Sequence, residues 1–215
     1  WETPKVDFDG AEAFVKVDRT VGPVSTFKSG EKAAHKALAH FLNVVLPMYA
    51  EGRNDPNQGA ISNLSPYFHF GQLSPQRVAL LTQDQESFFE ELVVRRELSD
   101  NFCLYNPHYD STQGFAHWAQ ETHMIHRQDP REYLYSQEEL EKAQTHDPLW
   151  NAAQKQMVHE GKMHGYLRMY WAKKILEWTP SPDEALRIAL KLNDKYELDG
   201  NDPNGYVGCA WSIGG

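Results

Sequence analysis

The chain has little cysteine, no long apolar run and no excess of basic charge. Its two cysteines, Cys103 and Cys209, lack both the density of a disulfide scaffold and the spacing of a zinc site, which favours an intracellular protein. No apolar run approaches the roughly 20 residues that cross a bilayer, so we expect no membrane segment. The net charge of −9 argues against a general nucleic-acid coat but is compatible with a local basic groove.

Several common catalytic motifs are also absent. The sequence has no GxGxxG run, no Walker loop and no serine elbow. His159 and His164 are five residues apart, which is not a metal-binding spacing. An EF-hand beginning at Asp199 would place Pro203 at its fifth position and Asn204 at its sixth, where an oxygen ligand and a glycine are required. We therefore predict no metal site.

The apolar residues recur at helical spacing and never alternate as in strands, which predicts an all-α fold. Residues 1–28 are read as a linker or surface strap, and residues 29–215 as one helical domain. Ser29 is the expected cap of the first helix, and residues 49–59 are expected to form a polar loop. Further helices are predicted over residues 85–103, 148–161, 160–178 and 181–192, with capping boxes at Ser136–Glu139 and Ser181–Glu184.

The segment 160–178 is an unusual helix because one face carries His164, Arg168, Trp171, Ile175 and Trp178. Two large aromatic residues favour burial of this face. A buried guanidinium costs several kcal/mol unless it is paired and hydrogen-bonded. The acid-rich stretch 192–215 could supply the partner, so we predict a buried ion pair between Arg168 and Asp199.

A second candidate site precedes Pro66, which is well placed at the first position of a helix. The amides and hydroxyls of the segment Ser62, Asn63, Leu64 and Ser65 would suit a phosphate, and Tyr49 and Arg53 could add a hydroxyl and a charge. The alternative is that the serines only cap the helix, with Tyr49 and Arg53 as surface residues.

Three tryptophans form a third candidate. Trp171 and Trp178 are seven residues apart, roughly 10 Å along a helix, and Trp150 on the preceding helix could pack near them. Such rings could pass an electron by hopping. Helical spacing in an ordinary core predicts the same pattern, so both interpretations stay open.

Four segments, in order, resemble class II cyclobutane pyrimidine dimer photolyases. They are SNLSPYFHFGQLSPQR at 62–77, EELVVRRELSDN at 90–101, KMHGYLRMYWAKK at 162–174 and DGNDPNGYVGCAWSIG at 199–214. The resemblance runs from about residue 29 to the last residue. It implies the helical domain of the photolyase and cryptochrome type, which binds FAD in a bent, U-shaped form.

The resemblance also implies roles for individual residues. It makes Tyr49, Ser62, Asn63, Leu64 and Ser65 a diphosphate clamp. It gives flavin contacts to Arg95, Arg168 and Asp199, and sets Asn193 against flavin N5. The lesion pocket would include Arg53, Asn54, Glu91, Met169 and Trp211. Trp171, Trp150 and Trp178 match the proximal, middle and distal electron-transfer tryptophans.

The implied activity is light-driven repair of cyclobutane pyrimidine dimers in DNA, by a monomer that uses FAD. The alternatives are a cryptochrome-like light receptor without repair activity and a helical scaffold that binds no flavin. The family pattern also includes an N-terminal α/β domain with an antenna chromophore and a basic segment beyond Gly215. The chain starts without Met and ends at Ile213-Gly214-Gly215, so we expect a piece of a longer protein, shortened at both ends.

Overall fold

The computed structural model describes residues 5, 7, 10–11, 14–15 and 17–215, so the predicted strap over residues 1–28 lies partly outside the described residues. The described part contains helices and no strand, as the all-α prediction required. The α-helices are α2 (Glu31–His40), α3 (Leu46–Gly52), α4 (Ser65–His69), α5 (Pro75–Leu81), α6 (Glu86–Phe89), α7 (Arg96–Tyr105), α8 (His117–His126), α9 (Gln137–Glu141), α10 (Pro148–Glu160), α11 (Gly165–Glu177), α12 (Pro182–Tyr196) and α13 (Pro203–Gly214). Two π-helical segments, η1 (Phe41–Val45) and η2 (Glu90–Arg95), and the 3₁₀ turn η3 (Thr112–Gly114) join them.

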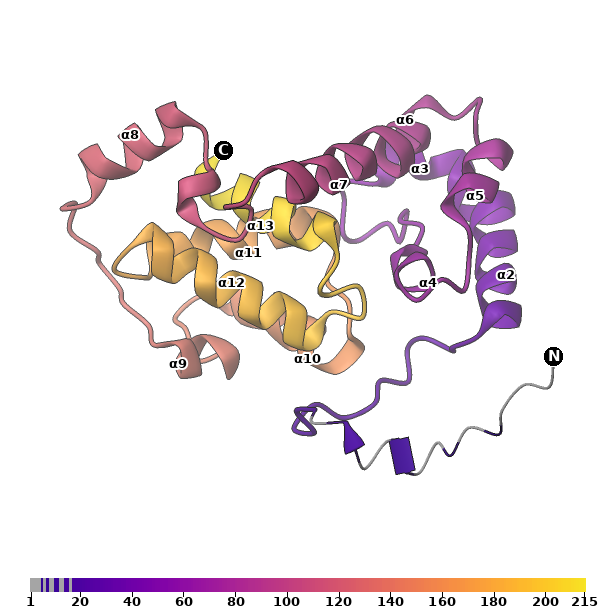
Figure 1. The fold of residues 1–215 in the computed structure, drawn as a ribbon, viewed down its shortest axis with the longest axis horizontal. Coiled ribbons are helices and arrows are strands. Elements are labelled where there is room, and N and C mark those ends of the chain that lie inside the picture. Colours follow the sequence, from indigo (N-terminus) through magenta and orange to yellow (C-terminus); the bar gives the residue numbers. More distant parts are fainter. Residues whose placement is uncertain (1–4, 6, 8–9, 12–13, 16) are drawn as a thin grey trace.

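The buried side chains form two hydrophobic cores. The first core includes Phe41, Leu64 and Phe88 and is built by the elements from α2 to η2. The second includes Trp150, Trp171 and Ile188 and is built mainly by the elements from α8 to α13. In Figure 1 the purple and the orange-to-yellow helices form two lobes, with α7 running between them and packing against α13. Each lobe therefore forms one side of the space between the two lobes.

Polar caps followed by proline set the start of the helices that build the second core. The Asp147 carboxylate accepts hydrogen bonds from the backbone N–H groups of Leu149 and Trp150, at 2.9 and 3.0 Å. Ser181 caps α12 and Asp202 caps α13 in the same way. Proline fits the next position because a first-turn N–H has no partner within the helix. The capping box predicted at Ser136 and Glu139 is confirmed in both directions.

Several predicted boundaries were wrong. Gly30, not Ser29, precedes α2, and α3 continues through Tyr49 to Gly52, within the expected polar loop. The helix predicted from residue 160 begins at Gly165, because Gly161 ends α10 in the left-handed conformation with φ of 67°. The helix expected to end at 192 runs on to Tyr196.

The two π-helical segments were not predicted. η1 lies directly before α3, whose first turn contains Pro47, a residue that cannot donate a backbone hydrogen bond. η2 interrupts the helix expected over residues 85–103 and carries Glu91 and Arg95. π-helical turns are rare and are often found at functional sites. By this criterion η2 is a candidate to line a functional site.

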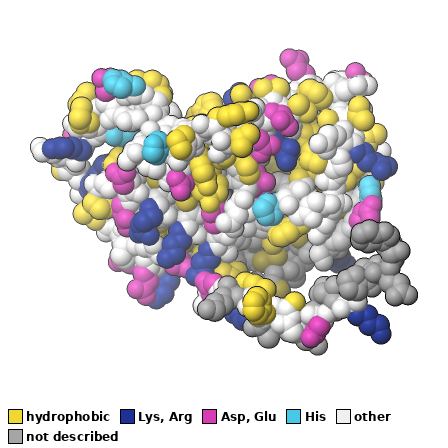
Figure 2. Space-filling model, in the orientation of Figure 1, with side chains coloured by type: hydrophobic (Ala, Val, Ile, Leu, Met, Phe, Trp, Pro, Cys, Tyr) yellow, Lys and Arg dark blue, Asp and Glu magenta, His cyan; other side chains and the backbone are white. Residues whose placement is uncertain are grey.

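The surface has mixed charge on the face that Figure 2 shows. Lys and Arg side chains gather there over α12, and acidic side chains lie among them. Among the described residues, no helix is long and apolar enough to cross a bilayer. The same residues contain no group of three His, Cys, Asp or Glu side chains suited to a metal ion.

Candidate functional site

Three adjoining hollows form one cleft, which starts between the two lobes and ends among α10 to α13. We call them the clamp hollow, of about 450 Å³, the tryptophan hollow, of about 580 Å³, and the arginine hollow, of about 110 Å³. Ligand sites in proteins usually occupy ~300–1,000 Å³. Met169 lines all three hollows, and Glu91 lines both larger ones. The hollows therefore meet around one methionine of α11.

The clamp hollow collects most of the residues predicted to hold a phosphate or a lesion. It is lined by Tyr49, Arg53, Asn54, Ile61, Ser62, Asn63, Ser65, Glu91, Lys162, Gly165, Tyr166 and Met169. Arg53 lies 2.8 Å from the Glu91 carboxylate and 5.7 Å from the centre of the Tyr49 ring. Tyr49 is buried and packs edge-on against Phe88, so the interpretation of Tyr49 as a surface residue was wrong.

The segment 62–65 does not act as a simple helix cap. Leu64 is the residue before α4, and its apolar side chain is fully buried. The Ser65 hydroxyl accepts a hydrogen bond from Lys162 at 2.7 Å instead of bonding the helix backbone. Asn63 has a positive φ of 52°, which turns the chain sharply before the helix. The capping alternative is therefore wrong for Ser65, whose hydroxyl faces the cleft side of α4.

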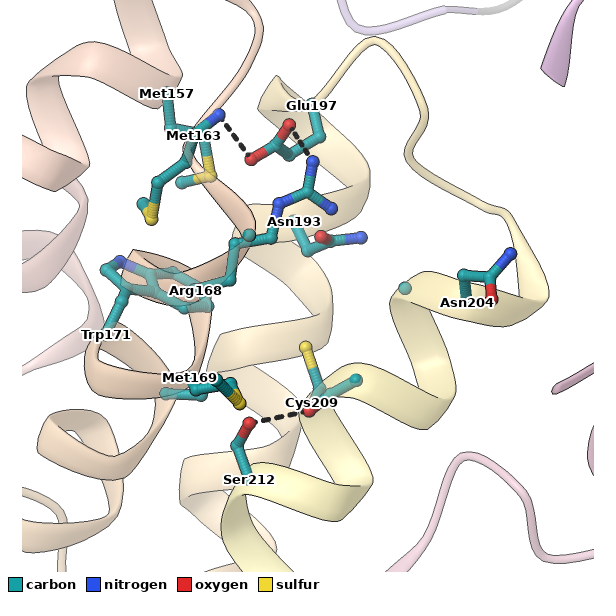
Figure 3. A pocket seen from close by; sticks show the side chains of 14 residues that line it. Met157, Met163, Arg168, Met169, Trp171, Asn193, Glu197, Asn204, Cys209 and Ser212 are labelled. Atoms are coloured by element: carbon teal, nitrogen blue, oxygen red, sulfur yellow. Dashed lines mark hydrogen bonds and ion pairs between the residues drawn. The ribbon is translucent and has the colours of Figure 1, made fainter. Parts of the chain in front are cut away.

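Arg168, which lines the arginine hollow, forms the ion pair predicted from the sequence. One nitrogen of the Arg168 guanidinium lies 2.9 Å from the Asp199 carboxylate and 2.6 Å from that of Glu197. Lys162 lies 2.5 Å from the other Asp199 oxygen, so two cations and two anions form a chain of ion pairs from Lys162 through Asp199 and Arg168 to Glu197. Figure 3 shows the Arg168 side chain reaching across the hollow toward Glu197 and Asn193. The network joins the start of α11 to the segment between α12 and α13.

Burial and ion pairing shift the pKa values of the two acids in this network in opposite directions. Burial alone would raise the pKa of Asp199, but the charges of Arg168 and Lys162 outweigh it and lower that pKa well below its usual range. For Glu197 burial is the stronger influence and raises the pKa to about 7, although Arg168 is close. The carboxyl of Glu197 is fully buried and also accepts the Met163 N–H at 3.0 Å. Asp199 is therefore the charged acid of the pair, and Glu197 can take up a proton near neutral pH.

Sequence reasoning missed Glu197 and Lys162. Both lie in segments that were singled out, Glu197 in the acid-rich stretch and Lys162 three residues before Gly165 of α11. A second buried cation next to Asp199 could not be deduced from helical spacing, because residues 161–164 are not helical.

The tryptophan hollow is lined mainly by apolar residues. It is lined by Glu91, Arg95, Leu98, Ser99, Phe102, Gly114, Phe115, Ala116, Met169, Asn204, Val207, Gly208, Ala210, Trp211 and Gly214. Trp211 is 61% exposed, and the Arg95 guanidinium lies 5.8 Å from its ring centre. Arg95 also pairs with Glu90 at 3.2 Å. Arg95 thus lies with Trp211 in this hollow, and does not line the arginine hollow with Arg168.

The three tryptophans form a continuous stack behind the arginine hollow. The rings of Trp171 and Trp150 are nearly parallel, with centres 6.3 Å apart, and Trp178 meets Trp150 edge-on at 5.7 Å. Trp171 also lines the arginine hollow. All three side chains are buried in the second core. The rings follow one another in the predicted order, Trp171, Trp150 and Trp178. Close packing of the rings is expected both for an ordinary core and for electron transfer, so the order fits either interpretation.

Comparison with known proteins identifies the family. A deoxyribodipyrimidine photo-lyase of Potorous tridactylus is 56% identical over 218 residues, which cover 98% of this chain and 41% of that protein. The photo-lyase of Arabidopsis thaliana is 58% identical over 224 residues, which cover 98% of this chain and 45% of that protein. The chain belongs to the photolyase family. It spans less than half the length of these curated relatives, and no family model matches it.

Solved photolyase structures share the helical fold. A bacterial class III photolyase from Agrobacterium tumefaciens aligns with a TM-score of 0.69 and 23% identity, over 87% of this chain and 38% of that one. An archaeal photolyase from Sulfolobus tokodaii, which contains two FAD molecules, aligns with a TM-score of 0.68 and 19% identity, over 97% of this chain and 44% of that one. These alignments confirm the predicted helical domain of photolyases.

The four photolyase-like segments converge on the cleft. Segment 62–77 contributes to the clamp hollow and segment 90–101 to the tryptophan hollow. Segments 162–174 and 199–214 meet around the arginine hollow. Residues as far apart in the chain as Ser62 and Gly214 thus line one cleft, as expected if the sequence segments serve a common ligand.

Proposed function

We propose that this chain binds FAD in the cleft and forms the cofactor-binding and lesion-binding part of a class II cyclobutane pyrimidine dimer photolyase that acts as a monomer. The observation that carries the proposal is the position of Trp171, which lines the arginine hollow and starts the stack of buried tryptophans. A binding cleft that opens onto a line of closely spaced indole rings is suited to light-driven electron transfer. Membership of the photolyase family supports the same conclusion.

The residues of the cleft fit a large, polar and partly anionic cofactor. Arg168 lines the arginine hollow, and His164 lines a neighbouring hollow together with Ser62 and Lys162. Their buried nitrogen atoms Arg168 Nε and His164 Nε2 have no hydrogen-bond partner among the described residues. Buried polar atoms without a partner are costly, so a bound group that accepts from them would be favourable. In the clamp hollow, Ser62, Asn63 and Lys162 would meet the diphosphate. In the arginine hollow, Arg168 and Asn193 would face the flavin ring system.

The tryptophan hollow is suited to a lesion that has left the DNA duplex. A damaged and poorly stacked base pair is the least costly to extrude. The exposed indole of Trp211 and the side chain of Met169 would contact the extruded dimer through apolar surface. Glu91 borders this hollow and the clamp hollow, so its carboxylate would accept a hydrogen bond from an imide N–H of the extruded dimer. Bound FAD supplies, once reduced and excited by light, the electron that opens the dimer ring.

The proposal is tested with the full-length protein that contains this chain. The wild type should take up FAD, and light should remove dimers from damaged DNA. Glu91→Gln should lower the repair yield per absorbed photon and leave the flavin spectrum nearly unchanged. Glu86→Gln, a matched change in α6 outside the three hollows, should repair as the wild type does.

Two outcomes would contradict the proposal. A wild-type protein that takes up no FAD would leave the scaffold without a flavin as the better interpretation. Equal affinity for damaged and intact duplexes, together with a normal repair yield in Glu91→Gln, would favour the light receptor. Binding to intact DNA should be weak and should fall steeply with salt, because phosphate contacts alone hold it.

A further inference from the structure

The side-chain amide of Asn193 has a defined orientation in the arginine hollow. Asn193 is in the last turn of α12 and only 3% exposed. Its nitrogen lies 3.1 Å from a carboxylate oxygen of Asp194. A carboxylate can only accept hydrogen bonds, so the atom next to it must be the NH₂ group of the amide. Figure 3 shows the other atom of the amide, the carbonyl oxygen, on the side of Arg168.

The Asp194 carboxylate is itself held by two further donors. The Asn201 N–H donates to the oxygen that faces Asn193, at 2.9 Å, and the Tyr206 hydroxyl donates to the second oxygen, at 3.0 Å. Burial, followed by the charge of Asp194, raises the pKa of Tyr206 to about 12, so the phenol stays a donor over the ordinary pH range. Donors from α12, from α13 and from the loop between them therefore fix one carboxylate. Asp194 cannot turn away from Asn193 without losing these bonds.

Gly205 of α13 closes the other side of the amide. A Cβ atom at this position would lie 2.7 Å from the Asn193 nitrogen, which is closer than non-bonded atoms approach. Both Gly205 and Asn193 line the arginine hollow. Only glycine leaves room for the amide nitrogen between α13 and Asp194. The two constraints act on the same NH₂ group and come from different elements.

We propose that Asp194 and Gly205 are positioning residues that present the carbonyl oxygen of Asn193 to the ligand of the arginine hollow. The inference rests on the proposed function. A ligand group that donates a hydrogen bond to this oxygen would then be favoured in the hollow. A reduced flavin carries hydrogen on N5, whereas an oxidised flavin offers a lone pair there. The orientation of one amide thus makes the site prefer the reduced cofactor.

The first test replaces Asp194 by Asn in the FAD-bound, full-length protein. An amide at position 194 can donate as well as accept, so the Asn193 amide is no longer held in one orientation. We expect Asp194→Asn to weaken the preference for reduced over oxidised flavin about ten-fold, the effect of one hydrogen bond. For a two-electron couple, a ten-fold change is about 30 mV of lower midpoint potential. Asp183→Asn, on the exposed first turn of the same helix, should leave the potential unchanged.

The second test needs no flavin. Nuclear magnetic resonance on the flavin-free protein should show the side-chain NH₂ of Asn193, assigned by its loss in Asn193→Asp, protected from hydrogen exchange. Asp194→Asn should reduce this protection. Gly205→Ala should displace the amide and lower the potential further, and Asp194→Glu, which keeps a group that only accepts, should recover part of the wild-type value.

The outcomes separate the two proposals. If the wild type binds no FAD, the proposed function fails, and the exchange measurement still decides the orientation of the amide. If FAD binds and its potential is the same in wild type and Asp194→Asn, the positioning role is overturned. An unprotected Asn193 amide in the wild type would overturn it as well, whatever the potential.

Discussion

Removal of the Arg168 guanidinium tests the buried network directly. In the wild type, this group contacts Glu197 at 2.6 Å and Asp199 at 2.9 Å, and its side chain is 25% exposed. In Arg168→Ala, Asp199 keeps its contact with Lys162, so the acid left without a cation partner is Glu197. Because the sequence predicts only the pair of Arg168 and Asp199, Asp199 would be the acid expected to lose its partner. The second cation reverses the expectation.

The size of the effect follows from these contacts and depends on pH. Truncating one partner of a buried ion pair costs about 3–5 kcal/mol. Because Lys162 remains on Asp199, we expect the lower limit, about 3 kcal/mol, in the free energy of unfolding at pH 8. At pH 6 Glu197, whose pKa is about 7, is mostly protonated, and its contact with Arg168 is weaker. The loss should then fall to about 1.5 kcal/mol, the value of one hydrogen bond to a charged group.

Urea unfolding of the flavin-free protein at both pH values, followed by the fluorescence of the buried tryptophans, would measure the loss. Arg187→Ala is the matched control, because Arg187 lies 2.6 Å from Glu184 but its side chain is 50% exposed. Exposed pairs of this kind contribute about 0–1 kcal/mol. A loss for Arg168→Ala no larger than that of the control, or the same loss at pH 6 and pH 8, would refute the account of the network.

Two further predictions concern neighbouring residues. Glu197 stays protonated up to about pH 7 in the folded protein but loses its proton near pH 4.5 in the unfolded chain. The stability of the wild type should therefore fall relative to that of Glu197→Gln as the pH rises from about 4.5 to 7. Unfolding midpoints that run parallel for the two proteins across this range would contradict the assignment. Trp171→Phe should stop light-driven reduction of bound oxidised flavin while a previously reduced enzyme still splits dimers, and normal photoreduction in this variant would return the stack to simple core packing.

The parts of the fold that follow from local chemistry could be predicted from the sequence. Proline after a capping residue marks the start of α10 and α12, and the reciprocal bonds of Ser136 and Glu139 were expected from their spacing. The pair of Arg168 and Asp199 was expected because a guanidinium on an aromatic face needs an acid. Each of these inferences uses residues whose partners are near in sequence or unusual in type.

The parts of the fold and the site that depend on long-range packing could not be predicted from the sequence. Whether Glu197 or Asp199 is the more strongly paired acid depends on Lys162, which contacts Asp199 from the non-helical stretch that follows the end of α10 at Gly161. The contact of Arg95 with Trp211 depends on how η2 and α13 lie relative to each other, which spacing within one segment does not specify. The helix α13 was missed because its sequence is rich in glycine and small residues, which helical propensity disfavours.

The cleft divides the chain into two bodies, each with its own core, and α7 and α13 supply the main contact between them. A ligand that contacts both bodies therefore holds them together, and its binding free energy adds to the free energy of unfolding of the whole molecule. At a free concentration one hundred times its Kd, such a ligand contributes about 2.7 kcal/mol against unfolding. The supply of cofactor would then govern how long a newly made chain survives proteolysis, before any question of catalysis arises.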